Sequence, residues 1–478
     1  MEVWTRGRRI LDVTALDLAR IQFGTTTIFH FFFVPVSIGL AFFVAVCQTL
    51  HYRTGKDVYA RQVQFFGKLF LISFAVGVVT GIIQEFQFGM NWSQYSRFVG
   101  DIFGAPLAME GLAAFFLEST FIGLWIFGRD RLSPRLHLMT IWLVSGGTAL
   151  SAWFIIAANS WMQHPVGYKM EGGKPKLDDI GQVLFSSTTL WAYAHVLLAA
   201  LLTGSLLALS VAAWQLRNRG DRALFGSAAK VALPMVCVGL IGSFVIGDGL
   251  MRNMVTYQPM KVAAAEAMFN TEAPAPFSLF ATGDFTRNPG HTNRDLKVPH
   301  VLSLLATHSW NGEVQGINDL NAKYQKQYGP GEYAPFVAVV YWSFRVMVYT
   351  WGALAAFAAL GLLLWRRGKL ETSRWWLKLA IVAGVTPFLI NTAGWVMTEM
   401  GRQPWIVQGL LKTSDAVSPR VSTGQVVITL VGFVALFTVI GGIALWLFLR
   451  EARHDVTPPD PDDEAAAGAP EDTLSLAY

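Results

Sequence analysis

The amino-acid sequence predicts an all-α polytopic membrane protein with about nine transmembrane helices and one long extracytoplasmic loop between helices six and seven. Three observations carry this prediction. Of 478 residues, 53% are hydrophobic and only 14% are charged, more apolar surface than one soluble core could bury. The apolar residues gather in stretches of about 20 or more. Basic residues gather at the ends of these stretches, as membrane topology requires.

The nine spans are expected, in order, at 22–50, 66–89, 105–127, 137–160, 189–214, 231–250, 336–365, 377–398 and 425–449. One connection, 251–335, is polar and rich in Pro, Gly and Asn, and a loop of that length in a compact protein is usually functional or disordered. We therefore expect transmembrane helices one to six in 1–250, the long loop in 251–335 and helices seven to nine in 336–450. The acidic, apolar-poor segment 451–478 is expected to be a disordered tail.

Loop charge predicts the orientation. Clusters of Lys and Arg follow spans one, three, five and seven, whereas the alternate short loops carry few basic residues, such as the lone Arg97. The positive-inside rule then places the N-terminus and the long loop outside and the C-terminus in the cytoplasm. Arg6, Arg8 and Arg9 contradict this orientation, but four loops outweigh one tail. The net charge of +5 does not indicate nucleic-acid binding, because the basic residues form no single stripe.

Two histidines and two glutamates, His30, His195, Glu110 and Glu118, lie well inside stretches that are otherwise predicted to span the membrane. An ionisable group at bilayer depth costs at least ~2.5–3.5 kcal/mol on insertion scales, so it is retained mainly where it faces a cavity, a partner or a cofactor. Carboxylates indicate a proton route, and neutral imidazoles indicate metal ligands. Cys47 and Cys237 lie in apolar stretches and are expected to be inert buried thiols. The pattern favours redox chemistry inside a membrane.

Two histidines and one methionine are candidate metal ligands. Phenylalanines at positions 29 and 31–33 surround His30, which favours a flat apolar cofactor, although a hydrogen bond to a neighbouring helix is the alternative. His195 and Met347 are expected at the same depth, beside the long loop. Nitrogen and thioether are the ligand pair of a six-coordinate haem. The alternative for Met347 is a core side chain.

Arg345 and the segment GWVMTEMGRQPW supply further candidates. Arg345 is two residues from Met347, about 200° around an ideal helix, so it is either a guanidinium that reaches a propionate around the edge or a solvated helix-end charge. Glu399 closes an apolar span, with Trp395 one turn earlier on the same face. Glu399 and Arg402 form either a capping salt bridge or a carboxylate ligand with its neutralising cation. Pro404 must break the helix here.

Carboxylates and one lysine complete the candidate set. Glu110 and Glu118 follow i, i+8 spacing on one helical stripe, which suits a proton relay, and pairing to other helices is the alternative. In the long loop, Lys261 and Glu266 are about 140° apart on a helix and so are not a pair. They belong either to a solvated amphipathic turn or to a site for a polar ring such as a quinol head group.

At this point several strings match a family. GRQPW after a glutamate, FRVM, AMEGLAAFFLEST, HFFFVPVSIGL and KVAAAEA together resemble subunit I of the cytochrome bd quinol oxidases. The resemblance runs over almost all nine spans and the long loop, and leaves only the termini uncovered. The long loop is similar to the shorter form found in the family, without an additional C-terminal insert.

The resemblance implies two haems b, one low-spin and one high-spin, and one haem d. His195 and Met347 would be axial ligands of the low-spin haem b, with which Arg345 would interact. His30 and Glu399 would be axial ligands within the pair formed by the high-spin haem b and haem d, in an order that the sequence leaves open. Trp395 and Arg402 would contact the haem pair, and Glu110 would sit beside it. Glu118 would lie in the proton path, and Lys261 and Glu266 would belong to the quinol-binding loop.

The resemblance also implies an enzyme that oxidises quinol at the outer face and reduces dioxygen to water with cytoplasmic protons. It would generate a proton motive force without pumping. The implied partners are subunit II of the oxidase, in many members a small single-span subunit, and the lipid bilayer of the bacterial cell membrane. Quinol and dioxygen are the implied substrates, and no nucleic acid is expected.

Two other classes of protein remain open at the level of sequence. A membrane transporter or channel would use Glu110 and Glu118 as coupling sites, but it leaves His30, His195 and Met347 without a role. No internal repeat is visible, which disfavours an inverted-repeat transporter. A haem protein that only moves electrons between quinone pools is disfavoured by the carboxylate-ended GRQPW segment, because such a carrier needs only haems with both axial positions filled.

Overall fold

The computed structural model describes residues 14–218, 221–285 and 290–454. Within these residues, nine helical segments are long and apolar enough to cross a membrane, which confirms the predicted fold class. The spans are α1 (Ala15–Thr54), α2 (Asp57–Met90), α3 to α4 (Ser93–Phe127), α5 (Pro134–Gln163), α7 (Ser187–Asn218), α8 (Arg222–Tyr257), α12 (Val337–Arg366), α13 to α14 (Arg374–Met400) and α15 (Thr423–Ala452). The tail expected in 451–478 lies almost entirely outside the described residues.

Several spans are longer than the sequence predicts. The helix α8 runs from Arg222 to Tyr257, whereas its apolar stretch was expected at 231–250. Hydropathy finds only the part of a helix that lies in hydrocarbon, and the polar first and last turns extend into the interfacial region. Side-chain caps fix where these longer helices begin. Thr14 and Ser422 form capping boxes at the starts of α1 and α15, and Asp221 caps α8.

Two spans are interrupted. The third consists of α3 (Ser93–Met109), the π-helix η1 (Glu110–Phe115) and α4 (Phe116–Phe127). The eighth consists of α13 (Arg374–Ala383) and α14 (Thr386–Met400), which meet at a turn. The shorter helices are α6 (Ile180–Phe185), α9 (Pro259–Ala265), α10 (Val301–Thr307), α11 (Ile317–Tyr328) and the 3-10 turn η2 (Thr413–Asp415).

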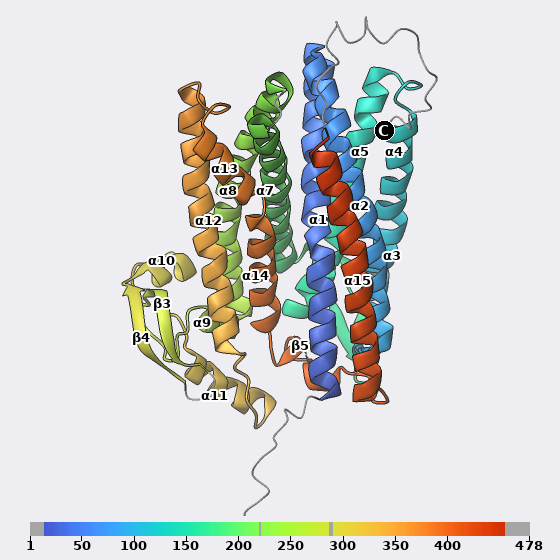
Figure 1. Ribbon diagram of the computed structural model, residues 1–478. Helices are drawn as coiled ribbons and strands as arrows, with labels where there is room; N and C mark the ends of the chain where they lie inside the picture. Colours follow the sequence, from blue (N-terminus) through green and yellow to red (C-terminus); the bar gives the residue numbers. More distant parts are fainter. Residues whose placement is uncertain (1–13, 219–220, 286–289, 455–478) are drawn as a thin grey trace, which may run out of the picture.

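Strands occur only outside the spans, in three antiparallel hairpins among the described residues. They are β1 (Tyr168–Glu171) with β2 (Lys174–Leu177), β3 (Phe277–Asp284) with β4 (His291–Val298), and β5 (Trp405–Val407) with β6 (Leu411–Lys412). The second hairpin, with α9, α10 and α11, belongs to the segment between α8 and α12. This segment forms a lobe beside the lower half of α12 (Figure 1).

The spans form two groups that meet at a close helix crossing. In Figure 1, α7, α8, α12 and α14 stand on one side, and α1 to α5 with α15 stand on the other. At the crossing of α1 and α7, Gly39 faces Gly204 and the carbonyl of Ala200. A Cβ on Gly39 would come within 2.1 Å of that carbonyl oxygen, so only glycine permits this approach.

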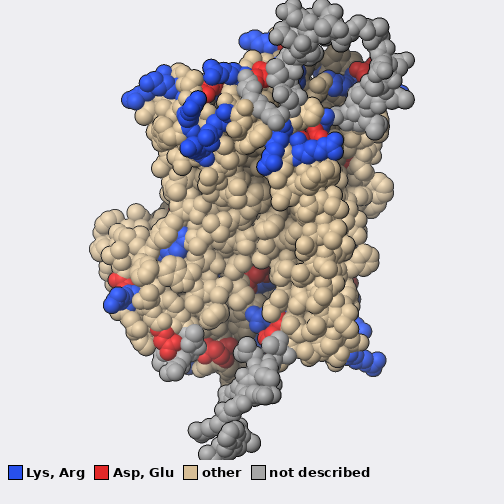
Figure 2. All heavy atoms as spheres, viewed as in Figure 1, with Lys and Arg blue, Asp and Glu red and all other residues tan. Residues whose placement is uncertain are grey.

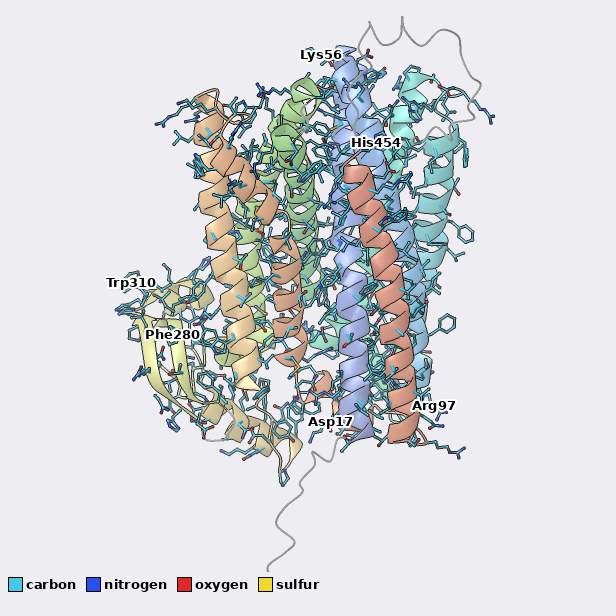
Figure 3. All side chains as sticks on the ribbon, viewed as in Figure 1. Asp17, Lys56, Arg97, Phe280, Trp310 and His454 are labelled. Atoms are coloured by element: carbon cyan, nitrogen blue, oxygen red, sulfur yellow. The ribbon has the colours of Figure 1, made fainter. Side chains whose placement is uncertain are left out.

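Charged side chains mark the two ends of the molecule. Lysines and arginines gather at the upper end, above a belt with almost no charge on the visible face (Figure 2). Lys56 and His454 lie at this end, while Asp17 and Arg97 lie at the opposite end (Figure 3). We call the two ends the basic end and the lobe end. The uncharged belt is what a bilayer-spanning protein requires.

Candidate functional site

His30 is held by α2 in a way that fixes its protonation. Its Nδ1 lies 3.0 Å from the hydroxyl oxygen of Thr80. The Thr80 hydroxyl donates its hydrogen to the carbonyl of Val76, 2.8 Å away, so its oxygen accepts from His30 Nδ1–H. The lone pair then sits on Nε2, which is the state of a metal-binding imidazole with an oriented second nitrogen. Gly81 lies directly against the ring, since a Cβ there would be 3.1 Å from Cε1.

The phenylalanines around His30 contact two other helices, α14 and α15. Phe29 stacks on Phe437 of α15 with ring centroids 4.6 Å apart. Phe31 meets Trp395 of α14 edge to face at 5.3 Å, and Phe32 meets Phe388 of α14. These rings therefore pack against protein, while they connect His30 to the helix that carries Glu399.

His195 and Met347 lie on α7 and α12, in the group of spans opposite His30. Among the described residues, Nδ1 of His195 is buried and has no hydrogen-bond partner, although buried polar atoms are normally paired. Gly247 of α8 faces the His195 ring, and Gly394 of α14 faces the Met347 sulfur. Each candidate ligand thus lies next to a residue without a side chain.

Arg345 is fully buried and forms an ion pair with Glu266 of the lobe. Arg345 Nη2 is 2.7 Å from Glu266 Oε2, and both side chains are only 1% exposed. The rings of Phe277 and Tyr341 lie within 4.7 Å and 4.5 Å of the guanidinium. The expectation of a solvated helix-end charge is therefore wrong, because the lobe folds back over α12 and covers Arg345.

Glu266 has a second partner, and its surroundings shift its titration. Its Oε2 accepts from the backbone N–H of Ser278 at 3.1 Å. Burial raises the pKa of Glu266 above its ordinary value, and the Arg345 guanidinium limits the rise. A solvated turn around Lys261 and Glu266 is likewise wrong, since both residues are 2% exposed.

Lys261 points away from Glu266, as the helical spacing predicts. Its Nζ donates to Gln163 Oε1 of α5 at 2.5 Å. Its alkyl chain lies on Gly401, where a Cβ would be 2.5 Å from Cγ. Burial lowers the pKa of Lys261 to about 7, with a further contribution from the positive charge of Arg402. Lys261 is therefore poised to exchange a proton near neutral pH.

Glu399 lies at the end of α14 in a network that reaches Lys261. Its Oε1 accepts from Asn159 Nδ2 at 2.9 Å and from Gln163 Nε2 at 3.4 Å. Its Oε2 pairs with Arg402, which also donates to the carbonyl of Ile406 at 2.7 Å. The helix ends at Met400, before Pro404 as predicted. Gln163 thus contacts both the lobe lysine and the carboxylate of α14.

Glu110 is the first residue of the π-helix in the third span, and Glu118 follows it in the first turn of α4. Ser151 of α5 donates to Glu110 Oε1 at 2.7 Å, and Glu118 is 5% exposed. Eight residues of ideal α-helix would leave the two carboxylates about 80° apart. A π turn takes more residues than an α turn and so reduces this offset. Gly147 of α5 faces Glu118, where a Cβ would be 2.7 Å from Cγ.

Four of these partners were not found from the sequence. Thr80, Ser151, Asn159 and Gln163 lie on α2 and α5 and hold the predicted residues by hydrogen bonds. The spacing of Asn159 and Gln163, one turn apart at the end of an apolar span, was the available signal. Polar groups at such a depth are usually functional.

The residues fit haem. Two imidazoles, a thioether and a carboxylate are iron ligands, and all four side chains are half-buried inside the bundle. His30 is in the tautomer with a free Nε2, and His195 Nδ1 is orphaned. Arg345 and Arg402 each keep a buried Nε without a partner among the described residues, as expected for cations near carboxylate-bearing groups.

A helical bundle of this size with such side chains at bilayer depth defines a multi-pass membrane redox protein. Residues 18–456 match the family model described as cytochrome bd terminal oxidase subunit I. The chain therefore belongs to that family, is a subunit of a cell-membrane terminal oxidase, and works with haem. It is an oxidoreductase of electron transport.

Two relatives and one solved structure support the same family assignment. The chain is 47% identical to cytochrome bd ubiquinol oxidase subunit 1 of Bacillus subtilis (strain 168), covering 93% of this chain and 95% of that protein. It is 35% identical to cytochrome bd-II ubiquinol oxidase subunit 1 of Escherichia coli (strain K12), covering 92% and 96%. The bd oxidase of Geobacillus thermodenitrificans is similar in structure, with a TM-score of 0.83 at 28% identity, covering 92% and 98%.

Proposed function

We propose that the chain is the haem-bearing subunit of a quinol:oxygen oxidoreductase that oxidises quinol at the lobe end and uses protons from the basic end. The observation that carries this proposal is the joint placement of imidazole, thioether and carboxylate side chains, each half-buried, inside one membrane bundle. The haems, when bound, carry electrons and reduce dioxygen to water. We infer two haems b and one haem d.

We assign His195 and Met347 as the axial ligands of the low-spin haem b. The orphaned Nδ1 of His195 and the glycines facing both side chains support this assignment. His30 and Glu399 would each hold an iron of the haem pair. Thr80 fixes the His30 tautomer, while Arg402 offsets the charge of Glu399. Trp395 lies one helical turn before Glu399 and contacts Phe31, the residue after His30.

Quinol would bind where the lobe meets α5 and α12. Oxidation of a quinol releases protons together with electrons, so its site needs groups that accept protons. Lys261, with its pKa of about 7, can accept one, and Glu266 can share one because burial raises its pKa. Arg345 holds Glu266 in place at 2.7 Å and would also lie beside the low-spin haem.

Protons for water formation would pass Glu118 and then Glu110. Both carboxylates lie in the same interrupted span, and the Ser151 hydroxyl donates a hydrogen bond to Glu110. Uptake from one side and release on the other would separate charge across the membrane without pumping. The basic loops favour the basic end as cytoplasmic, with the N-terminus outside. Oxidase subunit II and a small single-span subunit are the proposed partners.

The test is a reduced-minus-oxidised optical spectrum of the purified oxidase, with and without carbon monoxide. A chlorin band that shifts with carbon monoxide is expected, because one iron must keep an open position. Haem bands insensitive to carbon monoxide would instead indicate an electron carrier, and a protein without haem bands a transporter. In addition, His195→Ala or Met347→Leu is expected to remove the low-spin signal, and full low-spin absorbance in either variant would refute that ligand.

A further inference from the structure

The basic end carries a surface hollow that the oxidase chemistry does not use. It is open to the outside, has a volume of about 600 Å³, and lies between the starts of α2 and α8 and the end of α12. Its lining combines cationic, aromatic and hydroxyl side chains with one carboxylate, including Tyr59, Arg222, Ser227, Lys230, Trp365 and Glu371.

The charges of the hollow favour an anionic group. Lys230 Nζ is 2.6 Å from Glu371 Oε1, so the single carboxylate is already neutralised. The glutamate packs onto α8 because Gly226 has no Cβ, which would otherwise come within 2.6 Å of its carboxyl carbon. Arg222 forms no ion pair with any residue that the structure describes, and it is exposed. One guanidinium therefore remains for a ligand.

The hollow lies at the depth of lipid headgroups. The helix α8 has 36 residues and is about 54 Å long. A hydrocarbon core of about 30 Å leaves about 12 Å of this helix at each end. That is about eight residues, the separation of Lys230 from Arg222. The Trp and Tyr side chains of the hollow are typical of the same interfacial layer.

An apolar track descends from the hollow along α8. The exposed residues Pro234, Val238, Ile241 and Val245 follow one another at spacings of four, three and four, which places them on one face. The three aliphatic side chains are 56%, 65% and 58% exposed. A polar hollow that continues into an apolar stripe has the shape of a headgroup followed by an acyl chain.

We propose that this hollow is a binding site for a glycerophospholipid of the leaflet at the basic end, cytoplasmic under the proposed orientation. Its phosphodiester binds Arg222, beside the neutral pair of Lys230 and Glu371, and one acyl chain lies along the α8 stripe. Basic pockets between transmembrane helices on the cytoplasmic side bind lipid headgroups in this manner. The site requires only that the chain spans a membrane, so it stands apart from the assignment of haem and quinol residues.

The test is native mass spectrometry of the purified, delipidated oxidase complex titrated with dioleoylphosphatidylglycerol. We expect one lipid to be retained with preference, and Arg222→Gln to weaken its retention about tenfold, the value of one charge-assisted hydrogen bond. The matched control is Arg135→Gln, which removes an exposed cation at the same end but outside the hollow. Ser227→Trp keeps every charge, fills the hollow, and should also reduce retention.

Two competitors test whether binding requires the phosphate and the acyl chain in one molecule. Dioleoylglycerol, which has no phosphate, and inorganic phosphate, which has no chain, should both fail to displace the lipid. Equal losses in Arg222→Gln and Arg135→Gln would overturn the proposal, because they would indicate general electrostatic attraction. Full retention in Ser227→Trp, or equal retention of dioleoylglycerol, would also overturn it. An unchanged haem spectrum in each variant shows that the fold is intact.

Discussion

Removing either partner of the buried pair between Arg345 and Glu266 should give unequal effects on stability. Both side chains are 1% exposed, and the guanidinium is enclosed by aromatic rings. In Glu266→Leu the arginine stays charged, because guanidinium does not lose its proton in proteins. In Arg345→Leu the glutamate can be neutralised by protonation, since burial already raises its pKa.

The size of the effect follows from these contacts. Leaving one buried charge unpaired costs about 3–5 kcal/mol. With an unfolding entropy of about 2.1 cal/mol/K per residue, the 478 residues give about 1 kcal/mol per kelvin. The midpoint of thermal unfolding should therefore fall by about 3–5 °C in Glu266→Leu. In Arg345→Leu the Glu266 carboxyl has a raised pKa and therefore keeps its proton in the folded state to a higher pH than in the unfolded chain. The stability of this variant should be higher at low pH and decline as the pH rises through the folded-state pKa.

The assay is scanning fluorimetry of the purified oxidase at an acidic and at an alkaline pH, because Arg345→Leu should lose stability as the pH rises. The double variant Arg345→Leu/Glu266→Leu should be more stable than Glu266→Leu, because no charge is left unpaired. Lys176→Met is the control, since its pair with Asp101 joins side chains that are 46% and 42% exposed. Equal shifts for both single variants at both pH values, or a double variant that loses their sum, would refute the reasoning.

Three further predictions concern proton and metal handling. Thr80→Val should weaken the affinity for haem about 10–100-fold, because it removes the acceptor that orients His30, whereas Thr80→Ser should keep the affinity. A haemochrome assay measures the amount of bound haem. The quinol-oxidation rate should change through pH about 7 as Lys261 loses its proton, and Lys261→Met should lack that step; an identical pH profile would contradict the role. Glu118→Ala should slow oxygen consumption while the haem spectrum is retained, so unchanged turnover would count against the relay.

The nine spans could be predicted because each depends on a local property. An apolar stretch as long as the bilayer is thick must be helical, whatever surrounds it. The same reasoning found several candidate site residues, since His30, His195 and Glu118 are costly at bilayer depth unless they have a role. Helix ends were predicted less well. The first turns of α8, from Arg222 to Lys230, are bounded by charged residues and were left out of the predicted span.

The partners of these residues depend on contacts between distant parts of the chain. Asn159 reaches Glu399 only because α5 packs beside the end of α14, 240 residues later in the sequence. Likewise, Arg345 is buried because the lobe folds back on α12. The π-helix starting at Glu110 depends on which carbonyl each N–H selects, and composition does not encode that choice. These features required the three-dimensional arrangement.

The contact between Gly39 of α1 and Gly204 of α7 is a fixed point from which positions in the two groups of spans can be counted. His30 precedes Gly39 by nine residues, and His195 precedes Gly204 by the same number. Along an α-helix, nine residues correspond to about 13.5 Å. The two histidines therefore lie at equal distances along their helices from the glycine contact. Under the proposed ligand assignment, the distance between the two iron positions would depend on the rise of these helices and on this backbone contact. Alanine at either glycine would push the two groups of spans apart and increase this distance. The rate of electron transfer would then change, although both histidines would be retained.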